Sequence, residues 1–218
     1  MMKKTVLAMV AICLALLCGC RTKNAPSPTA TPTVTLPTAQ AKETVTPENY
    51  ALVQPESSET PAPTLGNGEG MPETQSFMNY TSTAGGYDVQ VPENWTPKAE
   101  GANITFTHGY SGIEVVIVKT AEPFTLENIK GVQVADLVRT GSAVNVISVS
   151  LANTKNGPAA YVEYESNSNG SAGKKIRLMN HRYYYPHEGE LAVLTMWAPL
   201  GADNQNIWSQ IPDTFFWR

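Results

Sequence analysis

The chain has 218 residues, of which 42% are hydrophobic, and its 15 basic and 19 acidic side chains give a formal net charge of −4. This balance disfavours nucleic acid as a partner, because phosphate contacts need clustered Lys and Arg. All three cysteines, Cys13, Cys18 and Cys20, lie near the N-terminus. No disulfide or cysteine-ligated metal is therefore expected in the rest of the chain.

The N-terminus is typical of an export signal. Lys3 and Lys4 form a short cationic segment, and Val6 to Leu17 is apolar apart from Cys13. An apolar run of about a dozen residues is too short for a bilayer core, which needs roughly 20 helical residues. The pattern therefore predicts a cleaved signal peptide rather than a transmembrane anchor.

The segment Leu17-Cys18-Gly19-Cys20 resembles the bacterial lipobox, in which an aliphatic residue and two small residues precede an obligatory cysteine. The resemblance implies a signal peptide over residues 1–19, cleavage before Cys20 and a thioether from the Cys20 sulfur to diacylglycerol. Cys18 stands where Ala or Ser is commoner, but it too is small. We expect lipid on Cys20 to hold the protein at the extracytoplasmic face of the cell membrane. The alternative is an ordinary secreted protein.

Residues 20–77 are predicted to form a disordered, Thr/Pro-rich tether. Between Arg21 and Phe77 lie nine of the sixteen prolines and eleven threonines, with Tyr50 and Phe77 as the only aromatic residues. This composition buries too little apolar surface to offset the entropy that is lost on ordering. An inert spacer is the favoured interpretation, and a glycosylated stalk or a binding motif is the alternative.

Residues 78–218 are predicted to form one globular domain, because their number suits a single core. Alternating apolar and polar residues, or apolar runs between turn residues, indicate its strands. Strands are expected at 87–91, 104–107, 113–118, 144–151, 159–165, 174–185 and 191–198. Dipeptides such as Asn156-Gly157 supply tight turns between consecutive strands, which predicts hairpins and an antiparallel sheet.

Two helices are expected in the same domain. Thr125 is a candidate N-cap for a helix that ends at about Arg139, before Gly141, although the apolar residues of this segment are spread round most of its circumference. Asp203 is a candidate N-cap for a second helix. Pro212 must end or kink that helix, because proline lacks the backbone donor that a helix interior needs.

The order of these elements resembles the PsbP-like domain family. The motifs that carry the resemblance are Val91-Pro92-Glu93-Asn94-Trp95, the pair Ala198-Pro199, and the closing Asp213-Thr214-Phe215-Phe216-Trp217. The resemblance implies an α+β fold, in which a central antiparallel sheet lies in an α/β/α sandwich with two main helices. It implies no catalytic residues, since members of the family mostly bind proteins or assist assemblies. We therefore expect a non-catalytic protein-binding or assembly module at the cell envelope, with an envelope protein as partner and without a cofactor.

The segment from His181 to Glu190 is the richest in functional side chains. Exposed aromatic residues are good anchors for a partner, because they supply rigid contact area at low entropic cost. The candidate partner-binding residues are Tyr183, Tyr184, Tyr185 and His187. In the alternative interpretation this is an edge hairpin whose tyrosines pack against neighbouring strands.

A second hypothesis is a small-molecule or metal carrier. His108, His181, His187 and Glu190 have the side chains that a first-row metal prefers. His181 and His187 are six residues apart and could not meet on one strand, so a site would need a hairpin bend and His108 from another strand. No metal site is assigned on the sequence alone.

The third hypothesis is an envelope hydrolase. Ser111 lies in Gly109-Tyr110-Ser111-Gly112, but Ile113 follows where the serine elbow of hydrolases has glycine. The pair Glu163 and Glu165 lies on one face of a predicted strand and would suit acid/base chemistry only in a cleft. The hydrolase hypothesis therefore requires Ser111 or this pair to lie in a cleft beside a base.

Overall fold

The computed structural model describes residues 59–65, 75–170, 174–202 and 205–218. The predicted signal peptide, Cys20, most of the predicted tether and the candidate cap Asp203 lie outside the described residues. In the part of the chain that the structure describes, no helix is long and apolar enough to cross a bilayer.

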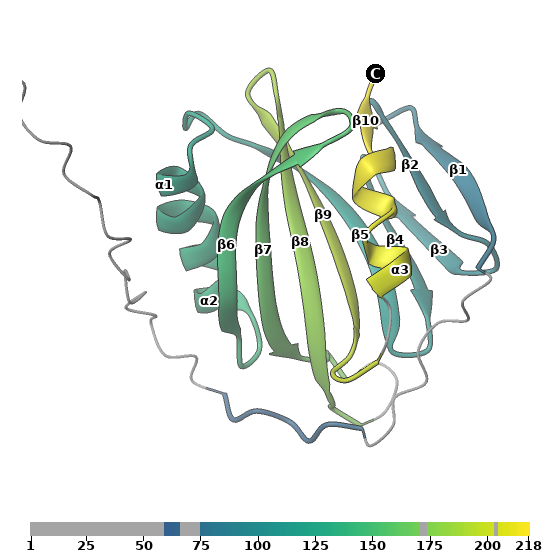
Figure 1. Ribbon diagram of the computed structural model, residues 1–218, viewed down its shortest axis with the longest axis vertical. Helices are drawn as coiled ribbons and strands as arrows, with labels where there is room; N and C mark the ends of the chain where they lie inside the picture. The colour runs from purple at the N-terminus through teal and green to yellow at the C-terminus, as the bar shows by residue number, and fades with distance from the viewer. Residues whose placement is uncertain (1–58, 66–74, 171–173, 203–204) are drawn as a thin grey trace, which may run out of the picture. The chain divides into compact units, whose positions relative to one another are not determined.

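A seven-stranded antiparallel sheet forms the centre of the domain (Figure 1). Its order is β3-β4-β5-β9-β8-β7-β6, so consecutive strands are neighbours except where β5 pairs with β9. The strands are β3 (Thr96–Glu100), β4 (Asn103–His108), β5 (Ser111–Lys119), β6 (Asn145–Thr154), β7 (Gly157–Asn167), β8 (Arg177–His187) and β9 (Glu190–Pro199). The hairpins predicted from the turn dipeptides are thus confirmed.

A second, smaller sheet has the order β1-β2-β10. It consists of β1 (Phe77–Ser82), β2 (Tyr87–Pro92) and β10 (Phe216–Trp217), all antiparallel. The sequence predicts only β2 of these, because β2 alone alternates between buried and exposed residues along its length. β1 and β10 are extended because each pairs with β2, and the two ends of the domain meet there.

One continuous helical segment joins β5 to β6. It consists of α1 (Leu126–Asn128), a π-helical stretch η1 (Ile129–Val134) and α2 (Ala135–Thr140). The Thr125 hydroxyl caps it by accepting a hydrogen bond from the Asn128 backbone N–H at 3.1 Å, and Gly141 follows its last residue, as predicted. The wider π turn places Ile129 and Val134, five positions apart, in the core. This change of period explains why the apolar residues looked spread round the helix.

The closing segment is helical but interrupted. It consists of α3 (Gln205–Trp208) and a 3₁₀ turn, η2 (Ile211–Thr214), rather than the single α-helix that was predicted. Pro212 lies in the first turn of η2, where its missing N–H costs nothing. The four apolar residues expected on one face, Ile207, Trp208, Ile211 and Phe215, are all buried.

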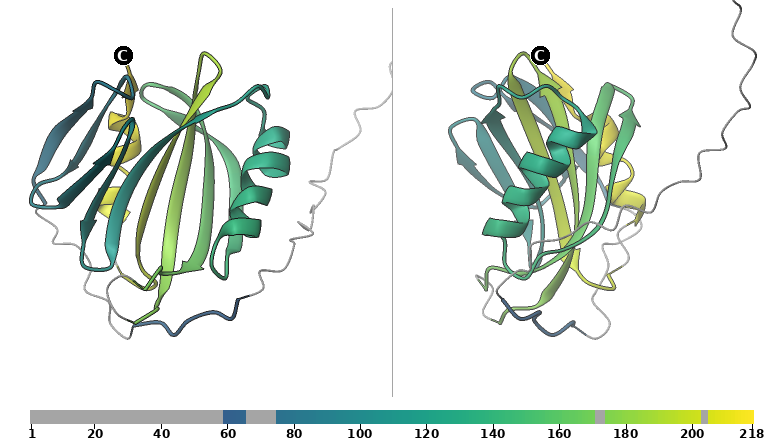
Figure 2. Two further views of the ribbon diagram at one scale, coloured as in Figure 1. Left: turned by 180° about the vertical axis from the view of Figure 1, so that it is seen from behind. Right: turned by 90° about the vertical axis from the view of Figure 1, so that its left-hand side faces the viewer.

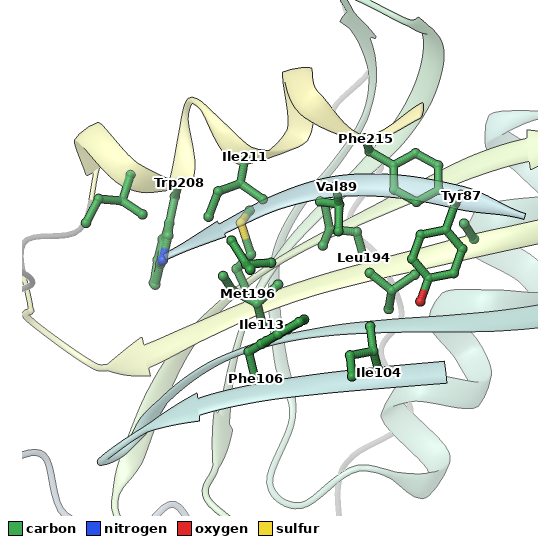
Figure 3. Packing of buried hydrophobic residues seen from close by; sticks show 14 of the residues in the cluster. Tyr87, Val89, Ile104, Phe106, Ile113, Leu194, Met196, Trp208, Ile211 and Phe215 are labelled. Carbon is green, nitrogen blue, oxygen red and sulfur yellow. The ribbon is translucent and has the colours of Figure 1, made fainter. Parts of the chain in front are cut away.

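The central sheet lies between two unequal layers (Figure 2). One face packs against the α1–α2 segment and forms a core cluster with residues of β6, β7, β8 and β9. The opposite face packs against α3, η2 and the smaller sheet, where Trp208 and Ile211 lie over Met196 and Ile113, and Tyr87 stacks on Phe215 with ring centroids 5.6 Å apart (Figure 3). The predicted arrangement of a central antiparallel sheet between helical layers is confirmed, and the smaller sheet adds to it.

Residues 59–65, called the strap below, lie along the ends of β7 and β8 (Figure 1). Asn167 holds the strap with its side chain, accepting from the Ala62 N–H at 2.7 Å and donating to the Thr60 carbonyl at 2.9 Å. The Arg177 N–H donates to the Pro63 carbonyl at 3.0 Å. Glu59 forms an ion pair with Lys175. The strap falls in the range predicted as tether, so that prediction does not hold for these residues.

The substitution Asn167→Ala tests the docking of the strap. It removes a buried side chain that makes both a donated and an accepted bond, so the free energy of unfolding is expected to fall by about 1–3 kcal/mol. A glutamate-specific protease is expected to cleave after Glu59 faster than in the original protein. Asn145→Ala, on the exposed start of β6, is the matched control. Equal cleavage rates in both variants would contradict a docked strap.

Candidate functional site

The structure separates the four predicted partner-binding residues. Tyr184 and Tyr185 are 1% and 4% exposed and point to opposite faces of the central sheet, and the Tyr185 hydroxyl donates to the Pro212 carbonyl at 2.9 Å. In this structure neither ring is exposed on the surface, which agrees with the alternative interpretation that these tyrosines pack against neighbouring elements. Tyr183 and His187 are half-buried, and the His187 ring is stacked on Trp217 at 5.0 Å. A partner contact at Tyr183 and His187 stays a prediction.

The three histidines lie in three separate environments. His108 is stacked beside Trp95, His187 lies beside Trp217, and His181 lies 4.4 Å from the Trp208 ring. Within the described ranges, no three His, Cys, Asp or Glu side chains come together in a way that could hold a metal ion. The proposed ligand set of the metal-carrier hypothesis is therefore not assembled by the described fold.

His181 is fixed as a neutral core residue. Its Nδ1 is hydrogen-bonded with the Tyr161 hydroxyl at 2.8 Å. Burial lowers the pKa of the His181 imidazole, and the nearby Glu163 carboxylate opposes this effect only in part. The neutral ring therefore suits the core under Trp208, and the protonated ring does not.

The candidate hydrolase residues are not hydrogen-bonded to a base within the described residues. Ser111 lies directly across the β4–β5 pair from His108, but within the described residues the His108 ring stacks beside Trp95 and is not hydrogen-bonded to the Ser111 hydroxyl. Glu165 forms an ion pair with the buried Arg177 at 3.1 Å, and Glu163 accepts from the Ser148 hydroxyl at 3.3 Å. Each carboxylate thus has a structural partner. The required combination of cleft and base is not formed by these residues.

A pocket with many polar lining residues lies on the central sheet and is called the Trp197 pocket below. It has a volume of about 500 Å³ and lies on the face that the α1–α2 segment covers only in part. Its lining residues come from β3, β4, β5, β7, β8, β9 and two turns. They are Lys98, Thr105, Thr107, Gly109, Tyr110, Ser111, Glu114, Asn167, Ser168, Asn169, Leu178, Asn180 and Trp197. Ser111 is thus part of a cleft, as the hydrolase hypothesis requires, but without a base bonded to it.

Trp197 forms the floor of this pocket. It is paired directly with Gly112 on the neighbouring strand. A Cβ atom at Gly112 would lie only 2.0–2.5 Å from three atoms of the six-membered indole ring. Glycine therefore lets the indole lie against the backbone of β5, in the way that aromatic residues cover glycines in other sheets. Trp197 is partly exposed and lines the pocket.

The polar side chains around Trp197 are held in place by their neighbours. The Thr105 hydroxyl donates to Glu114 Oε1 at 3.3 Å. The buried Asn180 donates through Nδ2 to the Ser166 hydroxyl at 2.9 Å and to the Tyr164 carbonyl at 3.2 Å. These bonds use neither Glu114 Oε2 nor Asn180 Oδ1. The pocket therefore offers prearranged acceptors beside an aromatic surface.

The charges of the pocket nearly cancel. Lys98 forms an ion pair with Glu100 at 2.7 Å, and this hydrogen bond raises the pKa of the Lys98 ammonium. Glu114 adds a negative charge on the same face of the sheet, since Lys98, Thr105 and Glu114 are consecutive cross-strand partners. Arg182 follows across Thr195 in the same row and offsets this charge by its electrostatic interaction with Glu114. The site therefore has little net attraction for either an anion or a cation.

Asn167 connects the pocket to the strap. It lines the pocket and holds Ala62 and Thr60 by the bonds given above. Its Oδ1 also accepts from Arg177 Nη1 at 3.3 Å. The strap thus runs beside the mouth of the pocket and shares one of its lining residues.

The sequence analysis singled out only Ser111 among the pocket residues. The available signal was the polar alternation within strands that otherwise look buried, with Thr105 and Thr107 in β4 and Thr195 and Trp197 in β9. Such alternation predicts a face that is not fully covered by apolar side chains. The contact between Trp197 and Gly112, in contrast, depends on the register in which β5 pairs with β9, and local alternation does not predict that register.

The buried imidazole gives a prediction for the pH dependence of stability. The pKa of His181 is lowered by folding from its ordinary value near 6.5. The unfolded state therefore binds the proton first, and the free energy of unfolding falls as the pH drops below about 6.5. In urea titrations at several pH values, His181→Gln is expected to flatten this fall, and Asn145→Ala at the exposed start of β6, which removes no titratable group, is expected to leave it unchanged. An unchanged pH profile in His181→Gln would contradict the assignment.

Comparisons with known proteins complete the description of the site. No protein-family model matches the sequence, and no curated protein matches it. The structure is similar to that of PsbP from the cyanobacterium Synechocystis (14% identity, 71% of this chain and 99% of the other, TM-score 0.47). It is also similar to the Ran-binding protein Mog1p of Saccharomyces cerevisiae (12%, 63% and 82%, TM-score 0.44). A third similar structure is LpqN, involved in cell envelope biogenesis of Mycobacterium tuberculosis (15%, 68% and 93%, TM-score 0.36). A PsbP is thus among the structures to which the fold is similar, as the sequence motifs predicted.

Proposed function

We propose that this chain is an exported lipoprotein, anchored by lipid on Cys20, whose domain is a non-catalytic binding module at the cell envelope. In this proposal the Trp197 pocket is the binding site. The lipobox-like segment before Cys20 supports the anchor. The pocket supports binding, because it combines a volume typical of ligand sites with a few fixed polar groups.

The observation that carries the proposal is the partly exposed Trp197 on Gly112. A large aromatic side chain contributes most to stability when it is fully buried, as Trp95 and Trp208 are. Trp197 instead turns part of its ring toward a polar cavity. An aromatic surface surrounded by prearranged hydrogen-bonding groups is the usual composition of a recognition site.

The side-chain pairings of the domain favour binding over catalysis. A serine or threonine nucleophile needs a base within hydrogen-bonding distance. The Tyr161 hydroxyl is hydrogen-bonded with the His181 imidazole, but this pair lies half-buried beside Trp208. Glu114 is bonded to Thr105 rather than paired with a second carboxylate. The pocket groups are thus suited to accepting and donating hydrogen bonds to a ligand.

The strap limits how far the domain reaches from the membrane. With residues 59–65 docked, the predicted spacer runs from Cys20 to Glu59. A spacer of this length would reach roughly 120 Å as an extended polyproline chain and about 35 Å as a flexible coil. A partner bound by the domain would therefore belong to the layer next to the membrane.

A protein partner that adds a strand is the second candidate, favoured by the edge strand β6. The other edge, β3, contains Pro97, Lys98 and Glu100, which protect edge strands from pairing. The sequence of β6, NVISVSLANT, has no charge and no proline, and Ile147 and Leu151 are 47% and 61% exposed. Such an edge suits the addition of an extended peptide.

The anchor is tested by Cys20→Ser. Lipid labelling is expected to be lost, and the domain is expected to move from the membrane fraction to the soluble fraction, because the thiol is the group that carries the lipid. Fractionation and radiolabelled fatty acid provide the measurement, with Cys18→Ser as the control that retains both. Membrane retention of Cys20→Ser would contradict the anchor.

The binding surface is tested by site-specific photocrosslinking in the full lipidated protein. A photoreactive side chain replaces Thr107 in the pocket, Leu151 on β6 or His187 on the hairpin. We expect the strongest adduct from Thr107. Strong adducts from Leu151 instead would favour the strand-adding protein partner, and strong adducts from His187 would favour the hairpin contact predicted from the sequence.

A further inference from the structure

We propose that the Trp197 pocket binds a neutral saccharide, with the indole of Trp197 stacked on the sugar ring and with Glu114 and Asn180 accepting hydrogen bonds from its hydroxyl groups. This inference rests on the proposed function, since it assigns a chemical class of ligand to the same site. The shape, the hydrogen-bonding groups and the charge of the pocket all suit such a ligand.

The first argument is the aromatic floor. The face of an indole carries the negative part of the ring quadrupole and attracts polarised C–H groups. A pyranose ring presents such C–H groups on one face and hydroxyls around its rim. Trp197 lies against the Gly112 backbone, so contact with β5 fixes the position of the indole before a ligand binds. A flat, prearranged surface of this kind suits a ring with one apolar face.

The second argument is the set of groups around the floor. A sugar hydroxyl is both a donor and an acceptor, so it is best satisfied by a mixture of acceptors and hydroxyls. Glu114 and Asn180 supply acceptor oxygens, and the exposed Thr107 supplies a hydroxyl. The bonds from Thr105 to Glu114 and from Asn180 to Ser166 hold two of these groups in place. Neighbouring hydroxyls on one sugar ring can donate to such fixed oxygens together.

The third argument is charge. A phosphate or carboxylate would need an uncompensated cation, but Lys98 is paired with Glu100 and shares its face with Glu114. An apolar ligand would desolvate Glu114 and Asn180 without replacing their bonds to water, which is costly. A neutral ligand rich in hydroxyl groups avoids both penalties.

The test is isothermal titration of the full chain carrying Cys20→Ser, which keeps every residue of the domain. The probes are maltotriose, cellotriose and chitotriose, with inorganic phosphate and the peptide Gly-Phe-Gly as the other chemical classes. At least one trisaccharide is expected to bind with a dissociation constant below about 1 mM, while phosphate and the peptide bind at least tenfold more weakly.

Two variants locate the binding. Trp197→Ala is expected to weaken trisaccharide binding at least tenfold, and Phe216→Ala, which removes an aromatic ring that is 52% exposed outside the pocket, is the matched control with unchanged affinity. Glu114→Gln keeps the shape of the side chain and is expected to weaken binding several-fold. If thermal unfolding shows that Trp197→Ala does not fold, the affinity of Glu114→Gln still tests whether the trisaccharide binds in the pocket.

The outcomes distinguish this inference from the proposed function. Absence of heat with all three trisaccharides at about 10 mM, or equal affinity in the original protein, Trp197→Ala and Glu114→Gln, would overturn the saccharide assignment. Binding of the peptide or of phosphate in place of the trisaccharides, if Trp197→Ala abolishes it, would also overturn it but leave a binding module. Failure of the proposed function is measured separately, by membrane retention of Cys20→Ser and by the absence of Thr107 adducts.

Discussion

The layout of this domain depends on a mismatch of widths between a helix and a sheet. A helix with its side chains is about 10–12 Å across, and seven strands spaced about 4.8 Å apart span roughly 30 Å. The single segment 126–140 can therefore cover only part of its face of the central sheet, and its core cluster lies over β6 to β9. The opposite face has α3, η2 and a second sheet to cover it. Polar side chains and Trp197 lie on the part of this face that the helical segment leaves uncovered. The pocket therefore forms because one helix is narrower than the sheet.

Two local features turn this uncovered area into a defined site. Gly112 provides the space in which the Trp197 ring lies on the sheet, and any larger residue would push the ring outward. Asn167 closes the other side and at the same time holds the strap, with the buried Arg177 bonded to Asn167, to Glu165 and to the Ala143 carbonyl. The lining of the pocket and the docking of the strap therefore share one residue. In the proposed lipoprotein, that segment also leads to the membrane anchor.

Local patterns in the sequence predicted the parts of the fold whose structure is decided locally. β2 and β4 alternate in burial, and the helical segment over 126–140 has its cap at Thr125 and ends before Gly141, as expected. β3 was missed because all of its residues are exposed and it contains Pro97. The tyrosines of β8 were misjudged because alternation tells which face a residue lies on, but not whether another layer covers that face. The pocket was missed for a related reason, since its residues are neighbours only in the register of β4, β5, β9 and β8.

The central claim is that binding occurs on the uncovered part of the sheet, and nuclear magnetic resonance measures this location directly. The full chain carrying Cys20→Ser is labelled with ¹⁵N, and the shifts of its amide and indole signals are followed as the tightest-binding trisaccharide is added. The account predicts that the largest shifts come from the Trp197 indole and from the backbone of Thr107, Glu114 and Asn180. Shifts confined to the hairpin near His187 or to the edge strand β6, with the Trp197 indole unmoved, would contradict it.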